Sequence, residues 1–217
     1  MKKNEVIIAP SILAANPLEL KSEIKKVEDA GGKWVHIDIM DGHFVPNLSF
    51  SPDTVKALRK VTGIFFDVHL MIVEPERYIE DFVKSGADGI TIHVEATEQV
   101  KKCLDMIHSF GLKAGLAINP ETPVGEIEKY LDIADMVLVM SVHPGHGGQK
   151  YIEDVNEKKA YLRKRMGDDF DIEVDGGIKS DNIKKVYDLG ANILVAGSAV
   201  FNDDIEGSVK KLIEECR

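Results

Sequence analysis

The sequence has few cysteines, no excess of positive charge and no long apolar run, and each shortage excludes a class of protein. Its two cysteines, Cys103 and Cys216, fall in helical patterns, which predicts free thiols of a cytoplasmic protein and not a disulfide framework. The net charge of −10 offers no general attraction to nucleic acid or to an anionic membrane. No apolar run reaches the length of a transmembrane helix.

What the sequence does contain is a repeated alternation of two patterns. Short runs rich in β-branched residues alternate with amphipathic stretches in which apolar residues recur at helical spacing. Eight such runs cover residues 5–11, 33–40, 64–72, 89–95, 113–119, 136–142, 171–177 and 192–201. Hydrophobic residues make up 44% of the chain, enough for a sizeable core.

The joins between these patterns repeat as well. Gly31, Gly86, Gly111 and Gly190 each stand just past a helical stretch, where a left-handed residue ends a helix. Proline marks the expected helix starts, as in "TPVGEI" after the fifth run. Alternating strands and helices predict a parallel sheet, and eight units of about 27 residues each predict a (β/α)8 TIM barrel.

An open doubly wound sheet is the competing architecture. It would carry a glycine-rich loop after the first strand, and residues 11–14 contain no glycine. The sequence also has no linker, low-complexity segment or charge block. We therefore expect one barrel domain over residues 1–217.

Polar side chains gather at the ends of three predicted strands. His36 and Asp38 alternate on one face of the second run, His69 ends the third and Asp175 ends the seventh. Barrel enzymes draw their active-site groups from these strand ends, so the four should converge. A divalent cation would give them a common partner, and the donors suit Zn²⁺ or Fe²⁺, with Mn²⁺ or Co²⁺ as alternatives. The other interpretation is a set of core hydrogen-bonding residues.

Glycine-containing turns follow the last three predicted strands. Residues 141–149, "SVHPGHGGQ", follow the sixth strand, Gly176 and Gly177 the seventh, and Gly197 and Ser198 the eighth. Backbone amides in such turns can hold an anion, and barrels bind phosphate with the loops after strands seven and eight. Because few basic residues lie here, amides would hold the phosphate. Three ordinary turns are the alternative.

Further residues at the strand ends have less specific meanings. Met40, Met71 and Met140 are either core filler or a means of excluding water from a reacting centre. His93 and Glu95, at the end of the fourth run, either support the ligands or form a satisfied pair in the barrel. No lysine ends these strands, which argues against a lyase. An inactive barrel acting as a binding subunit is a third possibility, and the intact ligand set argues against it.

The motifs "HIDIMDGHFVPN", "DVHLM", "PGHGGQ", "EVDGGI" and "VAGSAVF" resemble those of the ribulose-phosphate 3-epimerase family, over nearly the whole chain. The resemblance implies a (β/α)8 barrel of the ribulose-phosphate-binding type and a homo-oligomer. It implies interconversion of D-ribulose 5-phosphate and D-xylulose 5-phosphate in the pentose phosphate pathway. It makes Asp38 and Asp175 the acid/base pair, and both would bind the metal together with His36 and His69.

The resemblance also implies a set of substrate contacts around the strand ends. They are Ser11, Met40, His69, Met71, Met140, Gly145, His146, Gly147, Gly148, Gly176, Gly177, Gly197 and Ser198.

Three residues depart from the family pattern. His143 and His146 replace an Asn or acid and a Phe in the glycine loop, and Ser51 stands where pentulose enzymes tend to have Gly. Ser51 resembles the related D-allulose-6-phosphate 3-epimerases. A hexulose phosphate is therefore the alternative substrate, and a phosphate-binding lyase is a more distant alternative.

His146 would place a titratable donor near the phosphate, so substrate affinity should depend on pH. We expect the His146→Phe variant to lose that dependence. KM should be measured for both proteins between about pH 5.5 and 8. Identical KM profiles would refute the hypothesis.

Overall fold

The eight apolar runs form eight parallel strands in a computed structural model that describes residues 5–216. The strands are β1 Ile7–Pro10, β2 Trp34–Met40, β3 Phe65–Met71, β4 Gly89–His93, β5 Lys113–Ile118, β6 Met136–Met140, β7 Asp171–Asp175 and β8 Ile193–Ala196. They pair in the order β1-β8-β7-β6-β5-β4-β3-β2. A backbone bridge between Ser11 and His36 joins β1 to β2 and nearly closes the barrel.

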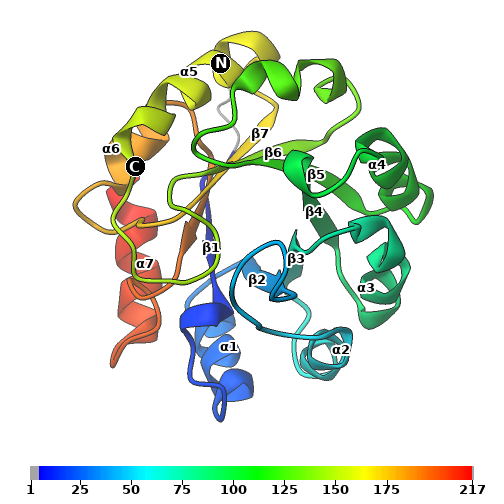
Figure 1. The fold of residues 1–217 in the computed structure, drawn as a ribbon. Coiled ribbons are helices and arrows are strands. Elements are labelled where there is room, and N and C mark those ends of the chain that lie inside the picture. Colours follow the sequence, from blue (N-terminus) through cyan, green and yellow to red (C-terminus); the bar gives the residue numbers. More distant parts are fainter. Residues whose placement is uncertain (1–4, 217) are drawn as a thin grey trace.

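The α-helices surround the strands (Figure 1). They are α1 Leu20–Asp29, α2 Pro52–Arg59, α3 Ile79–Ser85, α4 Val100–Ser109, α5 Asn156–Met166, α6 Ile183–Asp188 and α7 Ile205–Glu215. Gly31, Gly86, Gly111 and Gly190 all have positive φ, as predicted for residues that follow a helix. The (β/α)8 barrel is thus confirmed. Within residues 5–216, no helix is both long enough and apolar enough to cross a membrane.

The connection between β5 and β6 differs from the prediction. The sequence predicted a helix from "TPVGEI", but the structure has two short 3₁₀ helices, η4 Val124–Glu126 and η5 Glu128–Tyr130. Pro123 is compatible with a helix start, but Gly125 loses more conformational entropy in a helix than other residues do. A regular α-helix is therefore disfavoured at this point.

The alternation of side chains along each strand separates the core from the site. In β2, Val35, Ile37 and Ile39 belong to the main apolar core. His36 and Asp38 lie between them in sequence and so face the opposite side, the barrel interior. One strand therefore stabilises the fold with one face and supplies polar groups with the other.

The floor of the barrel interior is apolar. Trp34, Met136 and Ile193 are the first residues of their strands, and they pack in one buried cluster. The polar residues of β2, β3 and β7 follow them toward the carboxyl ends of the strands. This floor separates the polar interior from solvent at the amino ends of the strands.

Gly115 of β5 leaves room for Thr91, its partner in β4. A Cβ at this position would lie 2.9 Å from the Thr91 Cβ and closer still to the hydroxyl. We expect Gly115→Ala to lower the free energy of unfolding by about 1–3 kcal/mol through overpacking, as measured by urea denaturation. Gly63→Ala is the control, because no atom lies within 4 Å of its Cβ position. Equal losses in the two variants would contradict this account.

Candidate metal and active site

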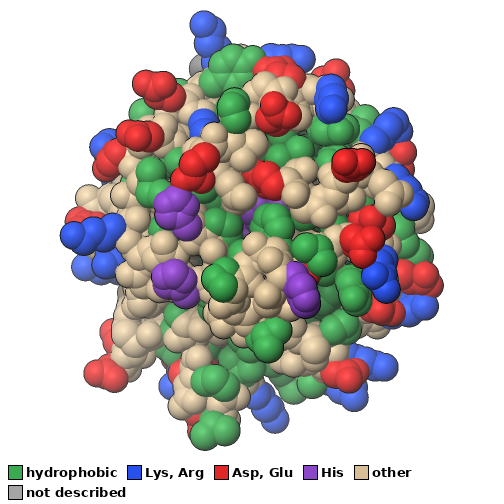
Figure 2. Space-filling view, viewed as in Figure 1, with side chains coloured by type: hydrophobic (Ala, Val, Ile, Leu, Met, Phe, Trp, Pro, Cys, Tyr) green, Lys and Arg blue, Asp and Glu red, His purple; other side chains and the backbone are tan. Residues whose placement is uncertain are grey.

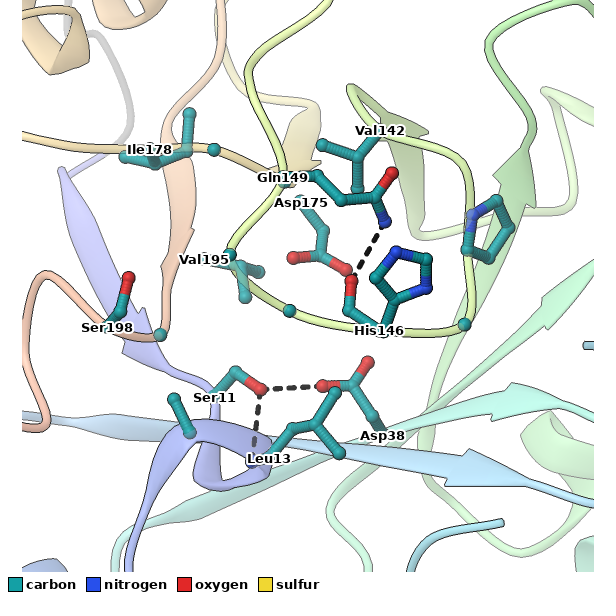
Figure 3. Close-up of a pocket in the computed structure, with 18 of the residues that line it drawn as sticks. Ser11, Leu13, Asp38, Val142, His146, Gln149, Asp175, Ile178, Val195 and Ser198 are labelled. Carbon is teal, nitrogen blue, oxygen red and sulfur yellow. Dashed lines mark hydrogen bonds between the residues drawn. The ribbon is translucent and has the colours of Figure 1, made fainter. Parts of the chain in front are cut away.

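A cavity opens at the carboxyl ends of the strands, and Asp38 of β2 and Asp175 of β7 enter it from opposite sides (Figure 3). Twelve predicted substrate contacts line it: Ser11, Met40, Met71, Met140, Gly145, His146, Gly147, Gly148, Gly176, Gly177, Gly197 and Ser198. His69 is completely buried and belongs to the cluster beneath the cavity. The strand ends are therefore brought together as the sequence predicted.

Several lining residues were missed from the sequence. Leu13, Val142, Gln149, Ile178 and Lys179 also line the cavity. Each lies one or two positions from a predicted contact, so proximity in sequence to the motifs was the available signal. Lys179 adds a basic side chain to the cavity wall.

His36, Asp38, His69 and Asp175 each offer a donor atom, and these four atoms lie within 4.8 Å of one another. Three of the atoms form a nearly equilateral triangle. His36 Nε2 is 3.3 Å from His69 Nδ1 and 3.3 Å from Asp38 Oδ1, and His69 Nδ1 is 3.2 Å from Asp38 Oδ1.

This triangle fits a divalent cation. Ligands at about 2.0–2.2 Å in a tetrahedral site stand roughly 3.3–3.6 Å from each other, close to the observed sides. Nitrogen and carboxylate donors without thiolate suit several divalent transition metals. His36, Asp38 and His69 are almost fully buried, so a cation would also relieve the cost of placing charge there.

The electrostatics of the cluster separate its two carboxyl groups. Burial and the nearby negative charge of Asp38 raise the pKa of Asp175 to about 7. Burial alone would also raise the pKa of Asp38, but the charge and hydrogen bond of His36 outweigh it and lower that pKa. Burial lowers the pKa of His69 to about 4, so its ring is neutral near pH 7.

Two acidic residues that sequence reasoning missed lie behind His36. Asp67 Oδ2 is 2.6 Å from His36 Nδ1, which is a hydrogen-bond distance. Because this bond occupies Nδ1, the other ring nitrogen, Nε2, faces the cluster. Glu173 Oε1 lies 3.3 Å from the same nitrogen, and burial followed by the charge of Asp67 raises the pKa of Glu173. His36, Asp67 and Glu173 also have donor atoms within 4.8 Å, but the short contact between His36 and Asp67 is better explained as a hydrogen bond.

Two serines hold the two aspartates in place. The Ser11 hydroxyl donates to Asp38 Oδ2 at 2.6 Å (Figure 3). The Ser141 hydroxyl lies 2.9 Å from the carbonyl oxygen of Asp175 and 2.7 Å from that of Gly176. Ser11 therefore fixes the carboxylate of Asp38, whereas Ser141 fixes the backbone that carries Asp175.

The turn after β7 requires glycine at both of its positions. Gly176 and Gly177 have φ of 120° and 66°. A Cβ on Gly176 would lie 2.5 Å from Val142 Cγ2, and one on Gly177 would lie 2.5 Å from the Tyr151 amide nitrogen. The turn thus packs closely on the loop after β6, beside the cavity. The face seen in Figure 2 mixes acidic and basic side chains around its edge and carries histidines near its centre.

The fold and the site together define the class. The chain is a (β/α)8 barrel with a cavity at the carboxyl ends of its strands, glycine turns on one side and a buried histidine–aspartate cluster at its base. Barrels of this class place their chemistry at this end.

The chain belongs to the ribulose-phosphate 3-epimerase family, whose sequence pattern it matches over residues 7–201. It is 50% identical over 207 residues to a ribulose-phosphate 3-epimerase of Synechocystis, covering 93% of this chain and 90% of that protein. It is 48% identical over 215 residues to the Bacillus subtilis protein of the same name, covering 97% of each. A chloroplastic ribulose-5-phosphate-3-epimerase of Arabidopsis thaliana is 50% identical over 204 residues, covering 92% of this chain and 73% of that protein.

Solved structures share the fold at low sequence identity. A 3-hexulose-6-phosphate synthase matches with a TM-score of 0.75 and 15% identity, covering 97% of this chain and 100% of that one. A tryptophan synthase α-subunit from Pyrococcus furiosus matches with a TM-score of 0.71 and 16% identity, covering 99% of this chain and 98% of that one. These likenesses support the barrel architecture alone.

The raised pKa of Asp175 predicts how metal binding depends on pH. Below about pH 7 Asp175 keeps its proton in the metal-free protein, and a cation must displace it. We expect affinity for Zn²⁺ to fall by at least about tenfold per pH unit below pH 7. When Zn²⁺ binds at about pH 6 in weakly buffered solution, the Asp175→Asn variant should release roughly one proton fewer per bound ion than the wild type does. A constant affinity between about pH 5.5 and 7.5 would contradict the assignment.

Proposed function

We propose that this protein is an isomerase that interconverts D-ribulose 5-phosphate and D-xylulose 5-phosphate at C3. Membership of the family and identities of 48–50% to ribulose-phosphate 3-epimerases support this substrate over D-allulose 6-phosphate. The observation that carries the proposal is the placement of Asp38 and Asp175 on opposite sides of one cavity.

Epimerisation removes a proton from one face of C3 and returns one to the other. Asp38 from β2 and Asp175 from β7 can reach opposite faces of a ketose that lies between them. One takes the proton while the other gives one, and the roles reverse with the direction of reaction. The Ser11 hydroxyl holds the Asp38 carboxylate, and the Ser141 hydroxyl holds the backbone at Asp175 and Gly176.

Loss of the C3 proton leaves negative charge on the sugar oxygens. His36, Asp38, His69 and Asp175 would hold one divalent cation, which when bound stabilises such charge electrostatically. We propose Zn²⁺ or Fe²⁺ for this site, with Mn²⁺ or Co²⁺ as alternatives, because the donors are nitrogen and oxygen. Met40, Met71 and Met140 line the wall and would exclude water.

The phosphate would lie at the glycine side of the cavity. Gly176, Gly177, Gly197 and Ser198 line it there, and turn amides bind phosphate without a cluster of basic residues. Lys179 would add one positive charge to that side. The loop of residues 145–148 would cover the substrate from the β6 side.

Three further features are proposals. Residues 1–217 would form one domain, although residues 1–4 and 217 lie outside the described part. The protein would act in the cytoplasm within the pentose phosphate pathway. It would form a homo-oligomer, for which Leu18 and Leu48, 91% and 74% exposed, offer apolar surface.

The direct test is NMR of ribulose 5-phosphate in D₂O with the purified protein. Deuterium should enter C3 while xylulose 5-phosphate appears. Deuterium exchange at C3 without formation of xylulose 5-phosphate would contradict epimerisation. A parallel sample with allulose 6-phosphate tests the alternative substrate, and faster turnover there would overturn the proposed one.

Asp38→Asn and Asp175→Asn should each reduce epimerisation in both directions by roughly 10²- to 10⁴-fold or more. In each variant the remaining carboxylate still faces one side of C3, so residual hydrogen exchange should be confined to one epimer. The two variants should exchange opposite epimers. Asp53→Asn, an exposed carboxylate of α2, is the control. A variant that epimerises at a near-normal rate would remove its residue from the mechanism.

A further inference from the structure

The two ring nitrogens of His69 face different surroundings. Nδ1 lies in the cluster, 3.2 Å from Asp38 Oδ1 and 3.3 Å from His36 Nε2. Nε2 lies 2.8 Å from Nε2 of His93, whose ring stacks on that of His69 at a centroid distance of 4.9 Å. Two imidazole nitrogens this close form a hydrogen bond only when one of them carries the proton and the other does not.

Glu95 decides which ring carries that proton. Its Oε2 lies 3.1 Å from Nδ1 of His93, and a carboxylate there accepts from an N–H. Burial alone would raise the pKa of Glu95, but hydrogen bonds from His93, the Asn119 backbone amide and the Thr122 hydroxyl outweigh it and lower that pKa to about 2. With its proton on Nδ1, a neutral His93 presents a bare Nε2. His69 must then donate from Nε2, which leaves the lone pair of its Nδ1 in the cluster.

Glu95 is itself held from outside the barrel. Its Oε1 accepts from the amide of Asn119 at 2.8 Å and from the Thr122 hydroxyl. The Lys158 ammonium of α5 donates to the carbonyl oxygens of residues 119, 120 and 122 at 2.9, 2.6 and 2.6 Å. A chain of hydrogen bonds therefore runs from α5 through the loop after β5 to His69.

We propose that His93 and Glu95 are positioning residues that fix the tautomer of His69 and so present its Nδ1 to the cation. The inference deepens the metal site of the proposed function and rests on it. His36 shows the reverse arrangement, since Asp67 holds its Nδ1 and leaves Nε2 in the cluster. The two histidines thus offer opposite nitrogens, each set by a carboxylate behind it.

The most informative variant is Glu95→Gln. The backbone N–H of Asn119 can only donate, so the side-chain oxygen of the introduced glutamine must face it. The side-chain NH₂ group must then face His93. His93 would then accept at Nδ1 and carry its proton on Nε2, which points at His69. His69 would be forced to carry its proton on Nδ1, inside the cluster, where it blocks a ligand.

The test uses the full-length chain stripped of metal and titrated with Zn²⁺ against a chromophoric chelator. We expect Glu95→Gln and His93→Leu to bind Zn²⁺ roughly 10- to 100-fold more weakly than the wild type. Asp135→Asn is the matched control and should bind as the wild type does. Asp135 likewise accepts from a backbone amide and a histidine ring, but it precedes β6, at the opposite end of the barrel.

A second readout does not need the metal. Long-range ¹H–¹⁵N NMR of the metal-free protein should show His69 protonated on Nε2 in the wild type and on Nδ1 in Glu95→Gln. Unchanged Zn²⁺ affinity in both variants, or the same His69 tautomer in wild type and Glu95→Gln, would overturn the inference. A wild type that binds no Zn²⁺ would instead overturn the metal site of the proposed function, and the NMR result would still decide the tautomer.

Discussion

Four donor side chains meet where little water can solvate them, and the rest of the site follows from that crowding. The donor atoms of His36, Asp38 and His69 stand 3.2–3.3 Å apart, with Asp175 alongside. Burial penalises each charge, and two carboxyl groups this near disfavour joint ionisation. The outward faces of the same strands are anchored in the main apolar core, so the side chains cannot move apart cheaply. A divalent cation would resolve the conflict.

Three of the four proposed ligands are also held from behind, and this support has a cost. Ser11 binds Asp38, Asp67 binds His36, and His93 binds His69. Within the described residues, both side-chain oxygens of Glu173 are buried without a hydrogen bond, because the nearby His36 Nδ1, 3.3 Å from Oε1, is already held by Asp67. An unpartnered buried group destabilises the fold by about 1–3 kcal/mol. The barrel therefore gives up some stability beneath the site, which is typical of interiors that serve function.

Much of this arrangement could be predicted from the sequence, because it rests on local rules. Side chains alternate along strands, which placed His36 and Asp38 on one face, and strand ends meet at one mouth. The same rule extended one step would have found Asp67 and Glu173, two positions before His69 and Asp175. The contact between His69 and His93 was not predictable, because it depends on the register of β3 against β4 and on barrel curvature. The sequence alone allowed His93 to be a support or an isolated pair.

The central claim is that one cation lies among His36, Asp38, His69 and Asp175. The most direct measurement is anomalous diffraction from a crystal grown with Zn²⁺. The account predicts one strong peak per chain, within bonding distance of His36 Nε2, His69 Nδ1 and the two aspartates. A peak among His36, Asp67 and Glu173 instead, or no peak in the barrel, would contradict it.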